Sequence, residues 1–179
     1  MERFTVCLDL DETLIHSKEY KFSEGCVRIG PYWTEARPHL DEFLKSLSGF
    51  NVGIYTYATE SYAQRIISNF FGDTNVSFLL SRNRCVNRYS QNPYGDYHNA
   101  YIKDLRKIAK HRRDLERFIA IDDCPYRYPR QYSNVIAVPE FTGGSDNVLV
   151  KLSRYLQYLS EFENVRAVEK RGWININFD

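Results

Sequence analysis

Two pairs of carboxylates stand where apolar segments of the sequence end. Asp9 and Asp11 follow a short apolar run near the N-terminus, and Asp122 and Asp123 follow a second run. Alternate side chains of a strand share a face, so Asp9 and Asp11 point the same way. Like charges that close are costly without a cation or a shared proton, and hard oxygen ligands suit Mg²⁺. The residues predict a metal-assisted phosphoryl-transfer site at the end of a buried strand.

The length and composition limit the class of protein. The 179 residues, 43% of them hydrophobic, predict one domain over residues 1–179 with a core of ordinary size. The apolar runs are too short to cross a membrane, and no signal segment precedes the first predicted strand. We therefore expect a cytoplasmic or nuclear monomer that is neither secreted nor membrane-bound. The four cysteines lack CxxC spacing, which favours free thiols over a zinc site or a disulfide framework.

The charge is divided unevenly along the chain. The net charge is +1, but residues 82–132 contain 12 basic and 6 acidic side chains. A basic segment attracts an anionic substrate, although a charge run is usually only a solvated face. The charge distribution supports phosphate binding without establishing it.

Short apolar segments alternate with amphipathic ones, which is typical of an α/β protein. Residues 17–36 predict a small β-hairpin insert after the first strand, and residues 82–99 predict a long irregular loop. We expect a Rossmann-like parallel sheet flanked by helices. The predicted strands cover residues 4–10, 51–55, 76–80, 118–121 and 134–138. The predicted helices run from Pro38 to Gly49, from Thr59 to Gly72, from about Asn99 to Ala109 and from Val148 to Leu159.

Ligands of such sheets bind beyond the carboxyl ends of the strands. The polar residues that follow the predicted strands include Asp9, Asp11, Thr56 and the second acidic pair. Lys103 comes just inside the predicted basic helix. Together these side chains supply a nucleophile, a second carboxylate, a hydroxyl and an ammonium group, as phosphoryl transfer requires.

The order and spacing of these residues resemble those of the haloacid dehalogenase superfamily. Asp9-Leu10-Asp11-Glu12-Thr13 matches its DxDxT signature, and the resemblance extends from Thr5 to about Leu159. It is closer to the Fcp-type and small CTD phosphatases, which dephosphorylate the tail of RNA polymerase II. Further matching segments are Arg37-Pro38-His39-Leu40-Asp41-Glu42-Phe43-Leu44, Tyr55-Thr56-Tyr57-Ala58, Tyr101-Ile102-Lys103-Asp104-Leu105, Ile121-Asp122-Asp123-Cys124-Pro125 and Asn134-Val135-Ile136-Ala137-Val138-Pro139.

The resemblance implies a role for each catalytic residue. Asp9 would be the nucleophile that forms an aspartyl-phosphate. Asp11 would protonate the leaving oxygen and then deprotonate the hydrolytic water, which requires a raised pKa. Thr56 would hydrogen-bond the phosphoryl oxygens, and Lys103 would offset their charge.

The resemblance also implies a Mg²⁺ site. The ion would be held by the Asp9 side chain, the Asp11 backbone carbonyl and the acidic pair Asp122 and Asp123, with Asp123 in direct contact. The family commonly has Asp-Asn in place of this pair, so the chain has one additional negative charge beside the metal.

Residues that contact the rest of the substrate are less clearly indicated. Tyr57 replaces a small residue beside the phosphate-binding threonine and narrows the pocket. Arg82, Arg84 and Arg88 follow the third predicted strand, and we expect at least one to meet phosphate or peptide. Taken singly, each arginine is better explained as solvated or ion-paired. The insert is shorter and the 82–99 loop longer than in the polymerase-tail enzymes, which argues against that tail as the substrate.

The sequence therefore predicts a Mg²⁺-dependent phosphatase that acts on phosphoserine or phosphothreonine of a protein, before phosphotyrosine. The alternative enzyme is a nucleic-acid 3′-end phosphatase, because the middle segment is basic. A non-catalytic binding scaffold is the alternative outside enzymes, but such chains typically lack the nucleophile. If these residues have only a structural role, Lys103 is an ordinary surface lysine and Thr56 is a helix cap.

Overall fold

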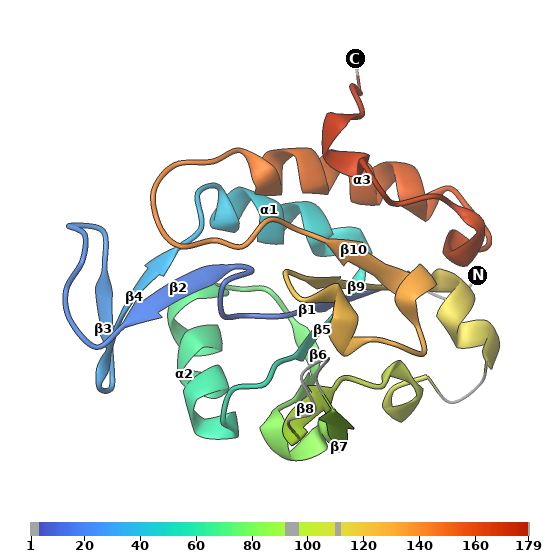
Figure 1. Ribbon diagram of the computed structural model, residues 1–179. Coiled ribbons are helices and arrows are strands. Elements are labelled where there is room, and N and C mark those ends of the chain that lie inside the picture. The colour runs from blue at the N-terminus through green and yellow to red at the C-terminus, as the bar shows by residue number, and fades with distance from the viewer. Residues whose placement is uncertain (1–3, 92–96, 110–111, 179) are drawn as a thin grey trace.

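The computed structural model describes residues 4–91, 97–109 and 112–178, and its centre is a parallel β-sheet (Figure 1). The strand order is β10-β9-β1-β5-β6, so β1 lies in the middle. Leu8 at the end of β1 is paired with Ile54 of β5 and with Ile121 of β9. The predicted parallel sheet is confirmed. Its strands are β1 (Thr5–Leu8), β5 (Asn51–Tyr55), β6 (Val76–Leu80), β9 (Phe118–Asp122) and β10 (Val135–Ala137).

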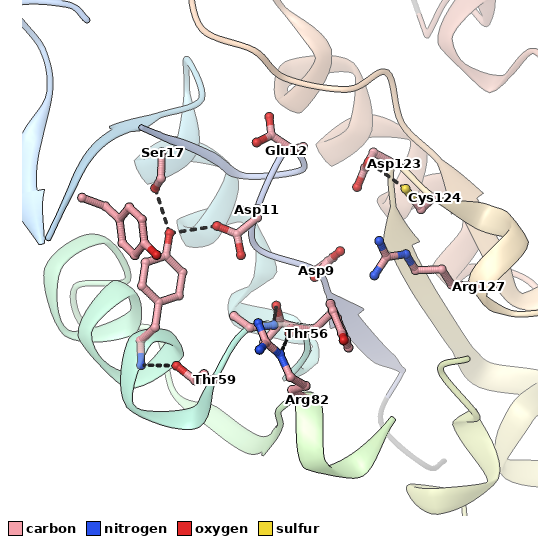
Figure 2. Close-up of a pocket in the computed structure, with 14 residues that line it drawn as sticks. Asp9, Asp11, Glu12, Ser17, Thr56, Thr59, Arg82, Asp123, Cys124 and Arg127 are labelled. Carbon is pink, nitrogen blue, oxygen red and sulfur yellow. Dashed lines mark hydrogen bonds between the residues drawn. The ribbon is translucent and has the colours of Figure 1, made fainter. Parts of the chain in front are cut away.

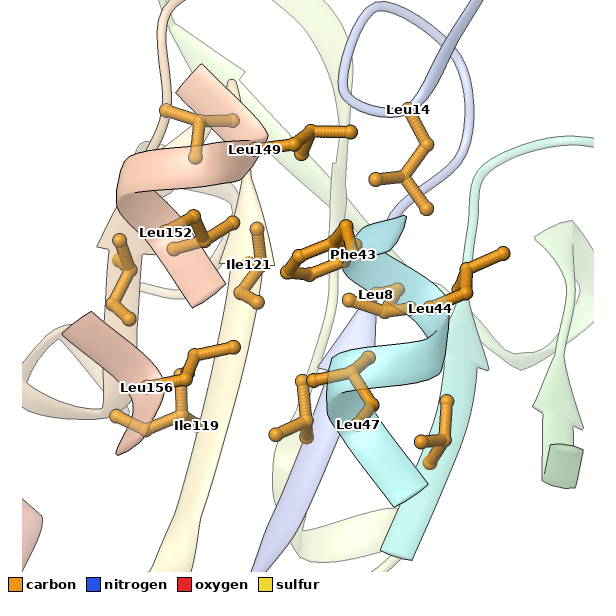
Figure 3. Close-up of a cluster of buried hydrophobic side chains, with 14 of the residues drawn as sticks. Leu8, Leu14, Phe43, Leu44, Leu47, Ile119, Ile121, Leu149, Leu152 and Leu156 are labelled. Atoms are coloured by element: carbon orange, nitrogen blue, oxygen red, sulfur yellow. The ribbon is translucent and has the colours of Figure 1, made fainter. Parts of the chain in front are cut away.

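The three α-helices of the described residues contribute buried side chains to one cluster with one face of the sheet. In Figure 3, leucines of α1 and α3 surround Leu8, Ile119 and Ile121. The helix α2 begins as predicted, because the Thr59 side chain accepts a hydrogen bond from the Tyr62 backbone N–H at 3.4 Å. The helices are α1 (Leu40–Ser46), α2 (Glu60–Phe70) and α3 (Val148–Ser160).

The opposite face of the sheet is covered by irregular segments. Cys7 and Ala120 alternate with the strand residues of the helical face and pack against Leu105, Leu115 and Tyr128. Both faces of the central strands are therefore buried, as near-continuous apolar runs predict for a parallel sheet.

The expected insert after β1 is a small antiparallel sheet in the order β2-β4-β3. Gly30 adopts φ +61° in the tight turn between β3 and β4, a conformation that suits glycine. The predicted β-insert at residues 17–36 is confirmed, and it gains a strand that starts at Ile15. Its strands are β2 (Ile15–Lys18), β3 (Val27–Ile29) and β4 (Tyr32–Ala36).

Two predictions for the middle of the chain are wrong. The expected loop at 82–99 contains strand β7 (Val86–Gln91), which pairs antiparallel with β8 (Tyr97–Ile102). The expected helix at 99–109 is β8 followed by the 3₁₀ turn Leu105–Lys107. The three-residue spacing of the apolar side chains Ile102, Leu105 and Ile108 matches the period of the 3₁₀ turn as well as that of a helix. The Pro93-Tyr94-Gly95 segment lies outside the described residues.

The segment after α3 packs as a tail, with 3₁₀ turns at Val165–Ala167 and Trp173–Asn175. Trp173 is buried, stacks on Tyr155 at 5.6 Å between ring centres, and donates Nε1–H to the Ala137 carbonyl at 2.8 Å. In the described part of the chain, no helix combines the length and the apolar character needed to cross a bilayer.

Candidate active site

A cavity of about 380 Å³ opens beside the carboxyl ends of β1 and β5 (Figure 2). The parallel register brings the polar residues together, because Asp9 and Thr56 follow paired strands and Asp122 ends β9. The Asp9 backbone N–H donates to the Ile121 carbonyl at 3.0 Å, which extends the β1–β9 pairing to the nucleophile candidate. The cavity is lined by Asp9, Asp11, Glu12, Ser17, Tyr32, Thr56, Tyr57, Ala58, Thr59, Tyr62, Arg82, Asp123, Cys124 and Arg127.

The loop after β1 is a tight turn fixed from several sides. The Leu10 carbonyl accepts backbone hydrogen bonds from Thr13 and Leu14, while Glu12 adopts a left-handed φ of 60°. The buried Arg37 guanidinium donates to the Thr13 carbonyl at 2.9 Å. These contacts hold both carboxylates of the signature on a rigid backbone.

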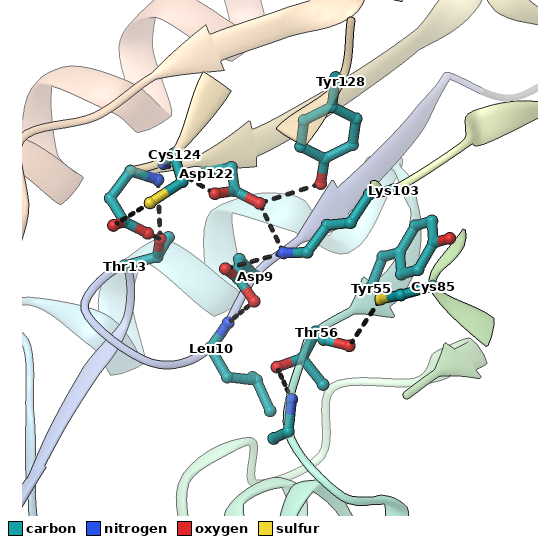
Figure 4. Close-up of polar contacts among 12 residues, drawn as sticks. Asp9, Leu10, Thr13, Tyr55, Thr56, Cys85, Lys103, Asp122, Cys124 and Tyr128 are labelled. Atoms are coloured by element: carbon teal, nitrogen blue, oxygen red, sulfur yellow. Dashed lines mark hydrogen bonds and ion pairs between the residues drawn. The ribbon is translucent and has the colours of Figure 1, made fainter. Parts of the chain in front are cut away.

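Lys103 is fully buried between two carboxylates behind the cavity (Figure 4). Its Nζ lies 2.8 Å from Asp9 Oδ2 and 2.6 Å from Asp122 Oδ2, and the buried Tyr128 hydroxyl donates to Asp122 at 3.0 Å. Burial alone would lower the pKa of Lys103, but the two adjacent carboxylates more than compensate and raise it. The ammonium group therefore stays charged beside Asp9.

Asp122 is committed to its neighbours. One carboxylate oxygen contacts Lys103 and Tyr128, and the other accepts the Cys124 backbone N–H at 2.8 Å. Burial and the charge of Asp9 raise the pKa of Asp122, and Lys103 opposes this shift. Asp122 thus holds Lys103 in place, and it is not one of the described residues that line the cavity.

Asp123 lines the cavity and is oriented by Thr13. The buried Thr13 hydroxyl donates to Asp123 Oδ1 at 3.0 Å and accepts the Asp123 backbone N–H at 3.1 Å. The Cys124 thiol donates to the other carboxylate oxygen at 3.1 Å. The sequence did not single out Thr13 as an orienting residue, although it occupies the threonine position of the signature.

Asp11 occupies a different environment from Asp9. Its Oδ1 accepts a hydrogen bond from the Tyr62 hydroxyl at 2.8 Å, and that hydroxyl also contacts Ser17 Oγ at 2.8 Å. Burial raises the pKa of Asp11 to about 6, the Tyr62 hydrogen bond opposes the shift, and the charge of Asp9 adds to it. The sequence placed Tyr62 only in the core stripe of its helix, so its contact with the acid candidate was missed.

The predicted phosphate and substrate residues are divided by the structure. Thr56 is buried at the cavity wall, where its Oγ1 accepts the Ala58 backbone N–H at 3.1 Å. Arg82 lines the cavity, donating Nε–H to the Tyr57 carbonyl at 2.8 Å with its guanidinium 4.7 Å from the centre of the Tyr57 ring. Arg84 and Arg88 are exposed and are not among the described residues that line the cavity.

Arg127 lines the cavity and was not predicted. It follows the second acidic pair in the 3₁₀ turn Pro125–Arg127, and its guanidinium lies 5.5 Å from the centre of the Tyr57 ring. Its place in the basic middle segment was the only sequence signal. The position of Arg127 in the sequence does not distinguish it from the other arginines of that segment.

Comparisons with known proteins agree with this geometry. The family model "NLI interacting factor-like phosphatase" matches residues 4–166. A Dictyostelium discoideum protein named "CTD small phosphatase-like protein 2" is 28% identical, with 92% of this chain and 29% of that protein covered. The Drosophila melanogaster "CTD nuclear envelope phosphatase 1 homolog" is also 28% identical, with 96% and 74% covered.

Among solved structures, the chain is similar to Fcp1, "an essential RNA polymerase II CTD phosphatase". The TM-score is 0.53 at 21% identity, with 91% of this chain and 51% of that chain covered. This similarity confirms the predicted haloacid dehalogenase-type fold. With the family match over most of its length, the chain belongs to the NLI interacting factor-like phosphatase family.

Proposed function

We propose that this chain is a Mg²⁺-dependent phosphatase that hydrolyses phosphomonoesters through an aspartyl-phosphate on Asp9. The observation that carries the proposal is the unequal setting of two carboxylates at one cavity. Asp9 forms an ion pair with Lys103, whereas Asp11 is half-buried beside Tyr62 and has a raised pKa. Environments that separate two carboxylates in this way assign one to attack and the other to proton transfer.

The reaction follows from these positions. An Asp9 oxygen attacks phosphorus as the bond to the leaving oxygen breaks, and protonated Asp11 donates its proton to that oxygen. Ionised Asp11 then accepts a proton from a water molecule that attacks the phosphoryl group, which releases phosphate and regenerates Asp9. The Thr56 hydroxyl donates to a phosphoryl oxygen, and Lys103 holds the attacking carboxylate.

The residues present fit a Mg²⁺ ion. Asp9, Asp11 and Asp123 supply hard oxygen donors at the cavity wall, while Lys103 is the ammonium group paired with Asp9 behind it. We assign the ion to the Asp9 and Asp123 carboxylates and the Asp11 backbone carbonyl, and we assign Asp122 to Lys103. Bound Mg²⁺ would neutralise charge on the transferring phosphoryl group.

The favoured substrate is phosphoserine or phosphothreonine in a protein, before phosphotyrosine. Support comes from relatives whose names identify them as phosphatases of a protein C-terminal domain.

The single-domain organisation, the monomeric state and a cytoplasmic or nuclear location also stay predictions. One relative is named for the nuclear envelope, so cell fractionation has to include membranes.

The enzyme proposal is tested by hydrolysis of an aryl phosphate in Mg²⁺ and after chelation. Metal-dependent release of phosphate is expected, and its absence from the native chain would favour a binding scaffold. Phosphopeptides and 3′-phosphorylated oligonucleotides then separate the two substrate classes. Faster turnover of the oligonucleotide, falling steeply with salt, would favour the nucleic-acid alternative.

Replacing Thr13 with Val is expected to weaken Mg²⁺ binding about 10–100-fold, as loss of an orienting partner typically does. Valine has nearly the same shape but removes both hydrogen bonds that fix Asp123. The measurement is the Mg²⁺ concentration that gives half-maximal activity. The Thr13→Ser variant keeps the hydroxyl and should behave like the native chain. If Thr13→Val reaches half-maximal activity at the same Mg²⁺ concentration as the native chain, Asp123 is not a ligand of the metal.

Replacing Tyr62 with Phe is expected to shift the pH profile of kcat/KM. The Tyr62 hydroxyl stabilises ionised Asp11, so its removal raises the pKa of this acid. The limb on which activity falls as Asp11 loses its proton should move to higher pH by about one unit. A shift to lower pH, or none, would contradict the role of Asp11 as the acid. Circular dichroism verifies that the variant folds.

A further inference from the structure

Two arginines line the cavity beside Tyr57. Arg82 and Arg127 both line it, and neither forms a salt bridge with a carboxylate of the residues that the structure describes. Their guanidinium groups lie 4.7 and 5.5 Å from the centre of the same ring, that of Tyr57. Arg127 is half-buried and Arg82 is exposed. A guanidinium group that lines a cavity without a contacting carboxylate suits a site for an anion.

The backbone holds both arginines firmly. The Arg127 carbonyl accepts the Lys103 backbone N–H at 2.8 Å, and its own N–H donates to the Cys124 carbonyl at 3.0 Å. The Arg82 N–H donates to the Ala58 carbonyl at 2.9 Å. Each arginine is thus anchored at its backbone to a segment that also carries an active-site residue.

Both guanidinium groups lie beside the ring of Tyr57. Arg82 donates a hydrogen bond to the Tyr57 carbonyl, and its guanidinium group lies over the Tyr57 ring. In the proposed reaction the scissile phosphate is attacked by Asp9 and held by Thr56, both of which line the cavity, so its binding does not require these arginines. Figure 2 shows Arg82 and Arg127 reaching the cavity from different segments of the chain. A planar guanidinium group forms paired hydrogen bonds with a phosphate or a carboxylate.

We propose that Arg127, with Arg82 and Tyr57, forms a second anion subsite that recognises a negatively charged group beside the scissile phosphate of a phosphopeptide. This inference rests on the proposed phosphatase function. The recognised group is a phosphoryl group or a carboxylate, and Arg127 determines the preference for substrates that carry it.

Three phosphoserine peptides that differ at one neighbouring position test the subsite: glutamine, glutamate or a second phosphoserine. Binding is measured by fluorescence anisotropy in an Asp9→Asn background, where hydrolysis does not interfere, and kcat/KM is measured with the native nucleophile. The Arg127→Gln variant should reduce the preference for the charged peptides over the glutamine peptide by about tenfold or more. The matched control is Arg154→Gln, an exposed arginine of α3 that does not line the cavity, which should keep the native preference.

The outcomes separate the subsite from the function. Equal loss of binding to all three peptides in Arg127→Gln would overturn the subsite, because Arg127 would then contact the scissile phosphate. An unchanged preference would overturn it as well. Selective binding that depends on Arg127, without hydrolysis by the native chain, supports the subsite and contradicts the phosphatase. Preference for both charged peptides shows that a carboxylate suffices, and preference for the doubly phosphorylated peptide alone shows that a phosphoryl group is required.

Discussion

The Asp9→Asn variant is expected to lose aryl-phosphatase activity by about a thousandfold or more in kcat/KM, as loss of a nucleophile typically does. The amide is nearly isosteric, and its one oxygen can accept either the Leu10 backbone N–H or the Lys103 ammonium, which now contact different oxygens of Asp9. Lys103 keeps its ion pair with Asp122. The amide cannot form the aspartyl-phosphate. The fold should therefore survive while the chemistry is lost, as seen by unchanged circular dichroism.

The control for this variant is Asp41→Asn, which makes the same chemical change on the exposed surface of α1. Asp41 pairs with Lys45 in solvent, where such pairs contribute little. Its activity should equal that of the native chain. If Asp9→Asn retains a substantial part of the native rate, the nucleophile is another group and the proposed mechanism is wrong.

The Lys103→Met variant is expected to lose both activity and about 3–5 kcal/mol of the free energy of unfolding. Methionine fills the space of the lysine stem but leaves Asp122 buried without its cation. Burying an unpaired carboxylate lowers the free energy of unfolding, whereas burying a well-packed apolar side chain does not. Denaturation by urea with the native chain as reference measures the loss.

A second substitution separates the cost of unpaired charge from that of poor packing. In Lys103→Met with Asp122→Asn, part of the lost stability should return, because the asparagine is neutral. Its oxygen can accept the Cys124 backbone N–H, and its NH2 group can donate to the Tyr128 hydroxyl oxygen. Activity should stay low. Equal stability of the single and double variants would show that charge burial is not the cause.

The sign of the pH effect follows from the same carboxylate. Without Lys103 the pKa of Asp122 in the folded state rises further above its unfolded value. The resulting penalty is present at neutral pH and disappears as the pH falls and Asp122 becomes protonated. The stability difference between Lys103→Met and the native chain should therefore shrink on acidification.

The strand ends were predictable from the sequence because one rule governs them. Once Asp9, Thr56 and Asp122 follow apolar strands of one parallel sheet, their convergence follows from the register. Lys103 was also singled out, but its burial between two carboxylates depends on how the β7–β8 hairpin returns to the sheet. No local pattern encodes that path, and the expected helix there was wrong.

Tyr62 and Arg127 show what the sequence could not supply. Tyr62 has the spacing of a core residue in α2, and only the tertiary fold brings its hydroxyl to Asp11. Arg127 is one of several arginines in a basic segment, and a role for it is indicated only by its short distance to the Tyr57 ring. In both cases the side chain type is informative only after its neighbours are known.

The most direct test of the central claim is detection of a phosphoryl group on Asp9. The Asp11→Asn variant, mixed with an aryl phosphate and Mg²⁺, should form the intermediate, because an aryl oxide leaves without strong acid assistance, and then hydrolyse it slowly. After rapid acid quenching, mass spectrometry of the peptide that contains Asp9 should show the mass of one added phosphoryl group. Absence of this adduct during turnover, or its presence on another residue, would contradict the account.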